Sequence, residues 1–172
     1  MVLKYSKRIP YIDTTVTPEK SRGDVERVLY AHGASAVNIV TQADGQAILR
    51  FVMDLARENT TKRIVVEITP PHISQKVKVW DEKLSRRVDR DVINTAAAWR
   101  VCFHFVKAKL DAVTTGLVEF EHEFLADTVI KDDQGREVTV AKILIPLLER
   151  TGGQLSLPPA SESVEERRRV VV

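Results

Sequence analysis

The chain has 172 residues, a formal net charge of +2 and a hydrophobic fraction of 44%, which is enough to form one domain with its own core. Its single cysteine, Cys102, excludes an internal disulfide. No apolar run reaches the 18 residues that a membrane-spanning helix needs, and the basic N-terminus lacks the apolar core of a signal peptide. We therefore expect a cytoplasmic protein.

The N-terminal segment predicts a short strand followed by a helix. Ile9, Tyr11 and Val16 suggest a β segment, and Pro10 would restrict such a strand to the edge of a sheet. Thr17 and Pro18 are typical of a helix start, with threonine as the N-cap and proline in the first helical position. Gly33 is a natural helix end. We expect a helix between these two signals.

Three antiparallel strands are expected next. Apolar runs at residues 36–41 and 46–53 flank Asp44-Gly45, and Asp-Gly between two such runs predicts a hairpin. A third strand over residues 63–68 stops at Pro70-Pro71. Strict alternation assigns one face of the second strand to the core, namely Ala47, Leu49, Phe51 and Met53.

Residues 72–88 form a basic connector, in which lysines alternate with Val77, Val79 and Trp80. This pattern predicts a further strand or an extended arm.

A single long helix is predicted over residues 89–126, with Asp89 or Asp91 as its N-cap. Its apolar residues recur at alternating spacings of four and three, which indicates one helical stripe. At 1.5 Å per residue such a helix would run about 50 Å, longer than a small sheet can cover. The residues of the stripe are Val92, Ala96, Trp99, Phe103, Val106, Leu110, Val113, Leu117, Phe120 and Phe124.

The C-terminal part predicts a small hairpin and a helix. Residues 129–130 and 138–140 flank a turn at 132–135, and an apolar helix over 141–150 contains Pro146. Residues 154–172 are rich in proline and serine and then charged, so we expect a disordered tail. The predicted fold is α+β. It is one domain over residues 1–153, with an antiparallel sheet of three to four strands packed by the N-terminal helix and the long helix.

Charge is distributed unevenly along the chain. Residues 62–109 carry eleven lysines or arginines against five acids, whereas residues 110–135 carry seven acids against Lys131 alone. The asymmetry indicates either salt pairing between subunits or a basic surface that meets a polyanion.

Enzyme motifs are weak. The seven glycines do not form a phosphate-binding loop, and one cysteine with four histidines gives no zinc-site spacing. Glu119 and His122 form half of a di-iron motif whose second copy is missing. Asp54 and Glu67 resemble part of a nuclease site, but the lysine that should follow is Thr69. We expect no catalysis, cofactor or metal, and we expect Cys102 to be buried and inert.

The basic connector indicates nucleic-acid binding. Proteins that hold single strands combine a positive groove with aromatic side chains on which bases stack. The alternative is that Val77, Val79 and Trp80 form the buried side of a strand and the lysines its solvated edge. The candidate binding residues are Lys62, Arg63, Lys76, Lys78, Trp80, Lys83, Arg86, Arg87, Arg90, Arg100 and Lys107.

Two segments resemble a family of small, mostly uncharacterised proteins of bacteriophages and prophages. They are the Thr-Pro-Glu-Lys helix start at 17–20 with its His-Gly-Ala end at 32–34, and the FEHEFL segment at 120–125. The resemblance covers most of residues 12–150 and implies a role in replication, recombination or nucleic-acid protection in the host cytoplasm. The order of helix, three strands and helix also resembles double-stranded-RNA-binding domains, although fold does not fix function.

From these patterns we expect a non-enzymatic protein that binds single-stranded DNA or RNA with little sequence preference, as an accessory in phage replication or recombination. The alternative is a phage structural or assembly protein whose long helix makes subunit contacts. In either case the long helix has a basic half and an acidic half. This charge pattern predicts a homo-oligomer, in which the acidic half of one helix approaches the basic half of another.

Overall fold

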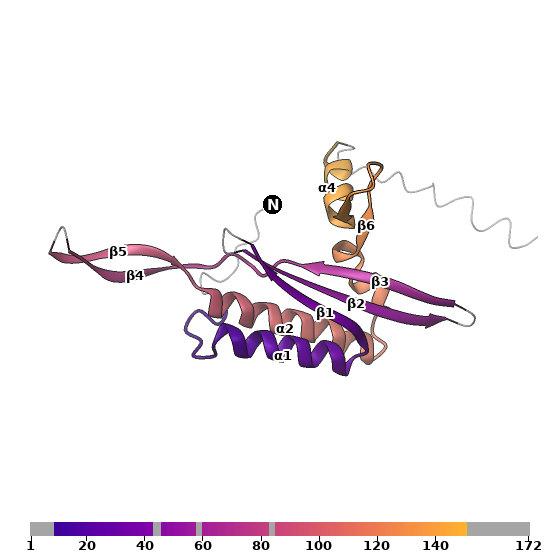
Figure 1. Cartoon of the computed structure of the whole chain (residues 1–172), viewed down its shortest axis with the longest axis horizontal. Helices are drawn as coiled ribbons and strands as arrows, with labels where there is room; N and C mark the ends of the chain where they lie inside the picture. The colour runs from indigo at the N-terminus through magenta and orange to yellow at the C-terminus, as the bar shows by residue number, and fades with distance from the viewer. Residues whose placement is uncertain (1–8, 43–45, 58–59, 83–84, 151–172) are drawn as a thin grey trace, which may run out of the picture. The chain divides into compact units, whose positions relative to one another are not determined.

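The computed structural model of the chain describes residues 9–42, 46–57, 60–82 and 85–150. The chain divides into two units, Met1–Val140 and Ala141–Val172, and each is described by itself (Figure 1). The predicted tail over 154–172 and the end of the predicted single domain lie outside the described residues. No helix in the described part is both long and apolar enough to cross a bilayer.

A three-stranded antiparallel sheet forms the centre of the first unit. Its strands are β1 (Ala34–Thr41), β2 (Ala47–Arg57) and β3 (Thr60–Ile68), in the order β1-β2-β3. The face of β2 predicted to enter the core does so, because Leu49 and Phe51 are fully buried and are paired with Ile68 and Val66 of β3. The predicted hairpin and the α+β class are therefore confirmed.

Helix α1 (Pro18–Ala31) begins and ends where the sequence predicts. The Thr17 hydroxyl accepts a hydrogen bond from the Lys20 backbone N–H at 3.2 Å, and Gly33 follows the helix with a φ of 91°. A positive φ costs glycine little, so this residue ends the helix without strain. Val25 and Leu29 are fully buried, and α1 packs against α2 and β1 on one face of the sheet (Figure 1).

The single helix predicted over residues 89–126 is wrong at both ends. Helix α2 spans only Thr95–Thr114, about 30 Å. Its N-cap is Asn94, whose side-chain oxygen accepts a hydrogen bond from the Ala97 N–H at 2.9 Å. At the other end the chain turns at Gly116, which has a φ of 73° and donates to the Val113 carbonyl at 3.0 Å, while Leu117 donates to Ala112 at 3.0 Å. These bonds form a Schellman motif, which stops the helix.

The apolar stripe continues past this stop because the chain folds back onto the same core. A short helix, α3 (Phe120–Glu123), is followed by a 3-10 turn, η1 (Leu125–Asp127). Phe124 is fully buried and meets Phe51 of β2 edge-on at 5.7 Å between ring centroids. By contrast, Leu117 at the break is 82% exposed. Spacing alone could not distinguish a continuous helix from a broken one.

The predicted N-terminal edge strand is absent from the described residues that precede α1. Residues 10–13 form a turn, Tyr11 has a φ of 60°, and the Thr14 N–H donates to the Tyr11 carbonyl at 3.0 Å. A left-handed residue next to a proline cannot continue a strand ladder. The Tyr11 ring instead stacks on His104 of α2 at 4.6 Å.

The basic connector is a β-hairpin, which we call the arm. It consists of β4 (Ser74–Asp81) and β5 (Arg86–Ile93), paired antiparallel with each other in a separate two-stranded sheet. The arm extends beyond the N-terminal end of α2 (Figure 1). Arg86 and Arg87 therefore lie in a strand rather than at a helix entrance, and Asp89 and Asp91 are strand residues rather than N-caps.

The predicted C-terminal hairpin is confirmed as β6 (Val129–Lys131) and β7 (Glu137–Thr139). It is joined to β3 by a bridge between Thr128 and Val66. The helix that follows, α4 (Val140–Arg150), includes Pro146.

Candidate nucleic-acid interface

The pairing of β4 with β5 sorts the side chains of the arm onto two faces, because directly opposed residues in an antiparallel ladder share a face. Trp80 is opposite Arg87, and the next pairs on the same face place acids opposite both lysines. We call this side the Trp80 face; its residues are Ser74, Lys76, Lys78, Trp80, Arg87, Asp89, Asp91 and Ile93.

The opposite side of the arm is more apolar, and we call it the valine face. Val79 is paired with Val88 at its centre. Towards the tip, Arg90 forms an ion pair with Asp81 at 3.2 Å. The valine face contains Gln75, Val77, Val79, Asp81, Arg86, Val88, Arg90 and Val92.

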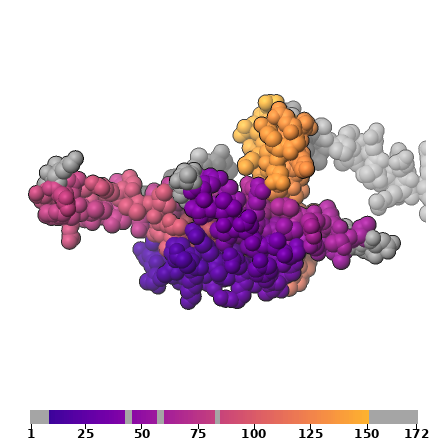
Figure 2. Space-filling model, in the orientation of Figure 1, coloured from indigo at the N-terminus to yellow at the C-terminus, as the bar shows by residue number. Residues whose placement is uncertain are grey.

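Trp80 is exposed, with 59% of its surface accessible. The alternative in which Val77, Val79 and Trp80 form one buried side is wrong, since alternation places Trp80 on the face opposite the two valines. Val77 is itself 36% exposed. In the space-filling view the arm stands clear of the helices and the three-stranded sheet (Figure 2). Trp80 therefore has an open ring that is opposite Arg87 and shares its face with Lys78 and Lys76.

Most cations of the arm lack the ion pairs that the basic side chains of the helices and the three-stranded sheet form. Within the part of the chain that the structure describes, Lys76, Lys78, Arg86 and Arg87 form no ion pair. Asp91 and Asp89 are nevertheless opposite the two lysines, and they reduce the positive potential of the Trp80 face. Lys83 lies outside the described residues.

Four predicted binding residues are separated from the arm and are engaged by acids. Arg63 of β3 donates to Asp54 at 2.8 Å, and this hydrogen bond lowers the pKa of the Asp54 carboxyl. Lys62 is 3.9 Å from Glu121. On α2, Arg100 is 3.5 Å from Asp24, and Lys107 is 2.6 Å from Asp111. The structure does not join these four to the arm.

No protein-family model matches the chain, and neither a curated protein nor a solved structure does. The resemblance to bacteriophage proteins stays a prediction.

The residues considered for catalysis are held in structural contacts. Asp54 pairs with Arg63, and Glu67 accepts a hydrogen bond from Arg50 at 2.7 Å. No group of three metal-ligating side chains occurs among the described residues; Glu119 is the N-cap of α3, and His122 lies within that helix. Cys102 is buried, and burial raises the pKa of its thiol to about 12. A thiol with so high a pKa is a poor nucleophile at neutral pH.

Asn94, which sequence reasoning missed, fixes the root of the arm. Its backbone N–H donates to the Ile73 carbonyl at 2.7 Å and closes the hairpin. Its side-chain amide donates to Gln75 at 2.9 Å and to the Ile12 carbonyl at 3.0 Å, while its side-chain oxygen caps α2. The signal was present, because asparagine before a run of alanines is a typical N-cap. One side chain thus ties β4 to the start of the helix.

Proposed function

We propose that the protein binds single-stranded nucleic acid through the arm, without catalysis and with little sequence preference. The observation that carries this proposal is the exposed Trp80 ring, which shares a face with Lys76, Lys78 and Arg87. Every base has a π-face, so stacking on Trp80 tolerates any sequence, while the cations neutralise phosphates. A role in phage replication or recombination is part of the proposal and is supported only by the resemblance given above.

The arm supports this function better than the wider basic surface first predicted from the sequence. Lys62, Arg63, Arg100 and Lys107 each lie beside a carboxylate, so binding a phosphate there would require an existing ion pair to break. Lys76, Lys78 and Arg87 meet no such competition within ion-pair distance among the described residues, whereas Arg90 of the arm pairs with Asp81. We therefore assign phosphate contacts to Lys76, Lys78 and Arg87, the cations of the Trp80 face.

Salt dependence tests this assignment. If these three cations neutralise phosphates of a single strand, log affinity falls with log salt at a slope of about −0.7 per phosphate, close to −2 in total. Raising the salt concentration from 50 to 200 mM should then weaken binding roughly 20-fold. The measurement is fluorescence anisotropy of labelled single- and double-stranded 30-mers of DNA and RNA. Affinity that does not change with salt would contradict the proposal.

A homo-oligomer stays part of the proposal, but its surface changes. We no longer expect the acidic half of one long helix to contact the basic half of another. Residues 89–93 belong to the arm, and the acidic residues after Gly116 fold back onto their own chain. Glu123, for example, pairs with Lys109 at 3.2 Å within the same chain. We now expect the subunits to contact each other through the valine face, because an isolated two-stranded hairpin is only marginally stable without a partner. This observation also favours the alternative role as an assembly protein.

A further inference from the structure

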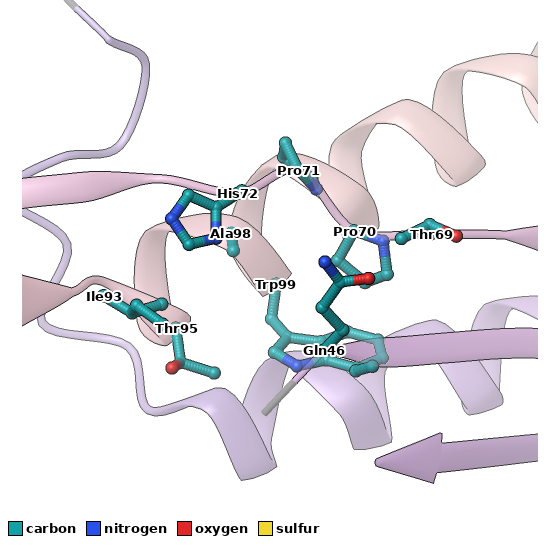
Figure 3. Close-up of a pocket in the computed structure, with 10 residues that line it drawn as sticks. Gln46, Thr69, Pro70, Pro71, His72, Ile93, Thr95, Ala98 and Trp99 are labelled. Carbon is teal, nitrogen blue, oxygen red and sulfur yellow. The ribbon is translucent and has the colours of Figure 1, made fainter. Parts of the chain in front are cut away.

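A pocket of about 260 Å³ lies at the root of the arm. It is formed where β2 begins, where the linker from β3 to β4 passes, and where α2 starts (Figure 3). The linker contributes Pro70, Pro71 and His72, and Thr95 and Ala98 come from the first turns of α2. The hydrogen bond between Asn94 and Ile73 holds the linker beside the helix, so the pocket is built by the same contacts that anchor the arm.

The lining chemistry suits an uncharged ring. None of the ten lining residues is a lysine, arginine, aspartate or glutamate. Pro70, Pro71 and Ala98 give apolar walls, whereas the Gln46 amide and the Thr95 hydroxyl bring hydrogen-bonding groups to its edge (Figure 3). A phosphate would find no cation here. A planar ring with donors and acceptors along its edge would find both kinds of contact.

The size of the pocket sets a limit on that ring. Pockets for drug-sized molecules measure about 300–1,000 Å³, so this one suits a single ring system. Trp99, which is only 1% exposed, and Gln46 both line the pocket (Figure 3). Gln46 itself is exposed at the start of β2. A ligand that enters deeply would therefore contact Gln46 first and then the tryptophan.

The Trp80 face leads to this pocket. Ile93, which lines the pocket, is opposite Ser74 on the same face of the ribbon as Trp80. The six steps along the chain from Ser74 to Trp80 span about 20 Å at 3.3 Å per residue. At 3.4 Å per stacked nucleotide, a strand that follows the arm would cover this distance with roughly six nucleotides.

We infer that the pocket takes one unstacked base of the strand that the arm holds. This inference rests on the proposed function and adds a second base-binding position to Trp80. The phosphates stay outside, along Lys76 and Lys78, while the base enters between the prolines and α2. Because the two positions are about six nucleotides apart, affinity should rise steeply between a four-mer and a ten-mer.

The test uses Trp99 as a reporter. The chain contains two tryptophans, so Trp80→Phe leaves Trp99 as the only one and keeps an aromatic ring on the arm. In the full chain with this substitution, a ten-nucleotide single strand should change Trp99 fluorescence, and a four-mer should do so only at far higher concentration. Adding Gln46→Ala and His72→Ala together should weaken ten-mer binding roughly 5- to 150-fold, the effect of losing one bound base.

Two controls keep the outcome decisive. His122→Ala removes a histidine at α3, away from the pocket, and should leave ten-mer binding unchanged. Ala98→Met fills the pocket instead of removing polar groups; if it unfolds the protein, the Gln46 and His72 variant alone decides. Ten-mer binding at full affinity in that variant, with no change in Trp99 fluorescence, would overturn the pocket but leave the proposed function intact. Absence of binding by the unmodified chain to any strand would overturn both.

Discussion

At the scale of single residues, Trp80 matters most for the proposed binding. A tryptophan that is 59% exposed contributes little to the core, whereas a base stacked on it would contribute about 1–3 kcal/mol to binding. Trp99 is the opposite case, since it is almost fully buried and contacts the Arg22 guanidinium at 4.9 Å. The two tryptophans of the chain therefore have separate roles, one on the surface and one in the core.

We predict that Trp80→Ala weakens binding of a single-stranded 30-mer by about 5- to 150-fold and leaves the melting temperature almost unchanged. Trp80→Phe should keep most of the affinity, because a phenylalanine ring still stacks. Anisotropy titrations and thermal melts of the two variants provide the measurement. If Trp80→Ala lowers the free energy of unfolding by several kcal/mol, Trp80 packs in the core instead of stacking on bases.

At the scale of elements, the charge pattern of the arm can be tuned. Asp89 and Asp91 are opposite Lys78 and Lys76, and each acid would repel the phosphates that we propose for the lysine across from it. We therefore expect phosphate binding by this face to be weaker than the number of its cations suggests.

We predict that Asp89→Asn combined with Asp91→Asn strengthens binding of a single strand several-fold at low salt, and that the gain shrinks as salt increases. A matched control is Asp133→Asn combined with Glu26→Gln, which changes the net charge equally outside the arm. Titrations at 50 and 200 mM salt compare the two. Equal gains in both variants would show that net charge, rather than the arm, governs binding.

The sequence predicts strands β1 to β3 well and the end of helix α2 poorly. Strands β1 to β3 were found because strict alternation, Asp-Gly and Pro-Pro all agree. The predicted helix runs past the end of α2 because Phe120 and Phe124 pack in the same core after the break. Their spacing is therefore the same as that of a continuous helical stripe. The Thr-Thr-Gly at 114–116 held the correct signal.

The candidate site was predicted only in part. The alternation in β4 was visible, but β5 reads Arg-Arg-Val-Asp-Arg-Asp-Val-Ile, and such a charged segment gives no strand signal until its partner is known. The exposure of Trp80 depends on what covers the ribbon, which is a tertiary property. For the same reason the ion pairs of Lys62 and Arg63 could not be read from their positions in the chain.

At the scale of the whole molecule, we expect two copies of the chain to associate through the valine face. Val77 and Val92 are 36% and 43% exposed, and burying them against a second copy would remove apolar area from water. We predict that light scattering at tens of micromolar protein gives a mass above the 19.4 kDa of one chain. Val79→Ser combined with Val88→Ser should lower it towards one chain. A monomeric mass for the unmodified protein would contradict this prediction.

If the arm carries the binding of nucleic acid, a chain from which most of the arm has been removed should fold but no longer bind. Replacing residues 76–91 with Asn-Gly keeps the pair of Gln75 and Val92 and the contacts of Asn94, and Asn-Gly closes a two-residue hairpin. The measurement is the affinity of a labelled single-stranded 30-mer at 50 mM salt for the unmodified and trimmed proteins. The account predicts binding at micromolar protein by the unmodified chain and its loss in a trimmed chain that still melts cooperatively. Equal affinity of the two proteins would contradict it.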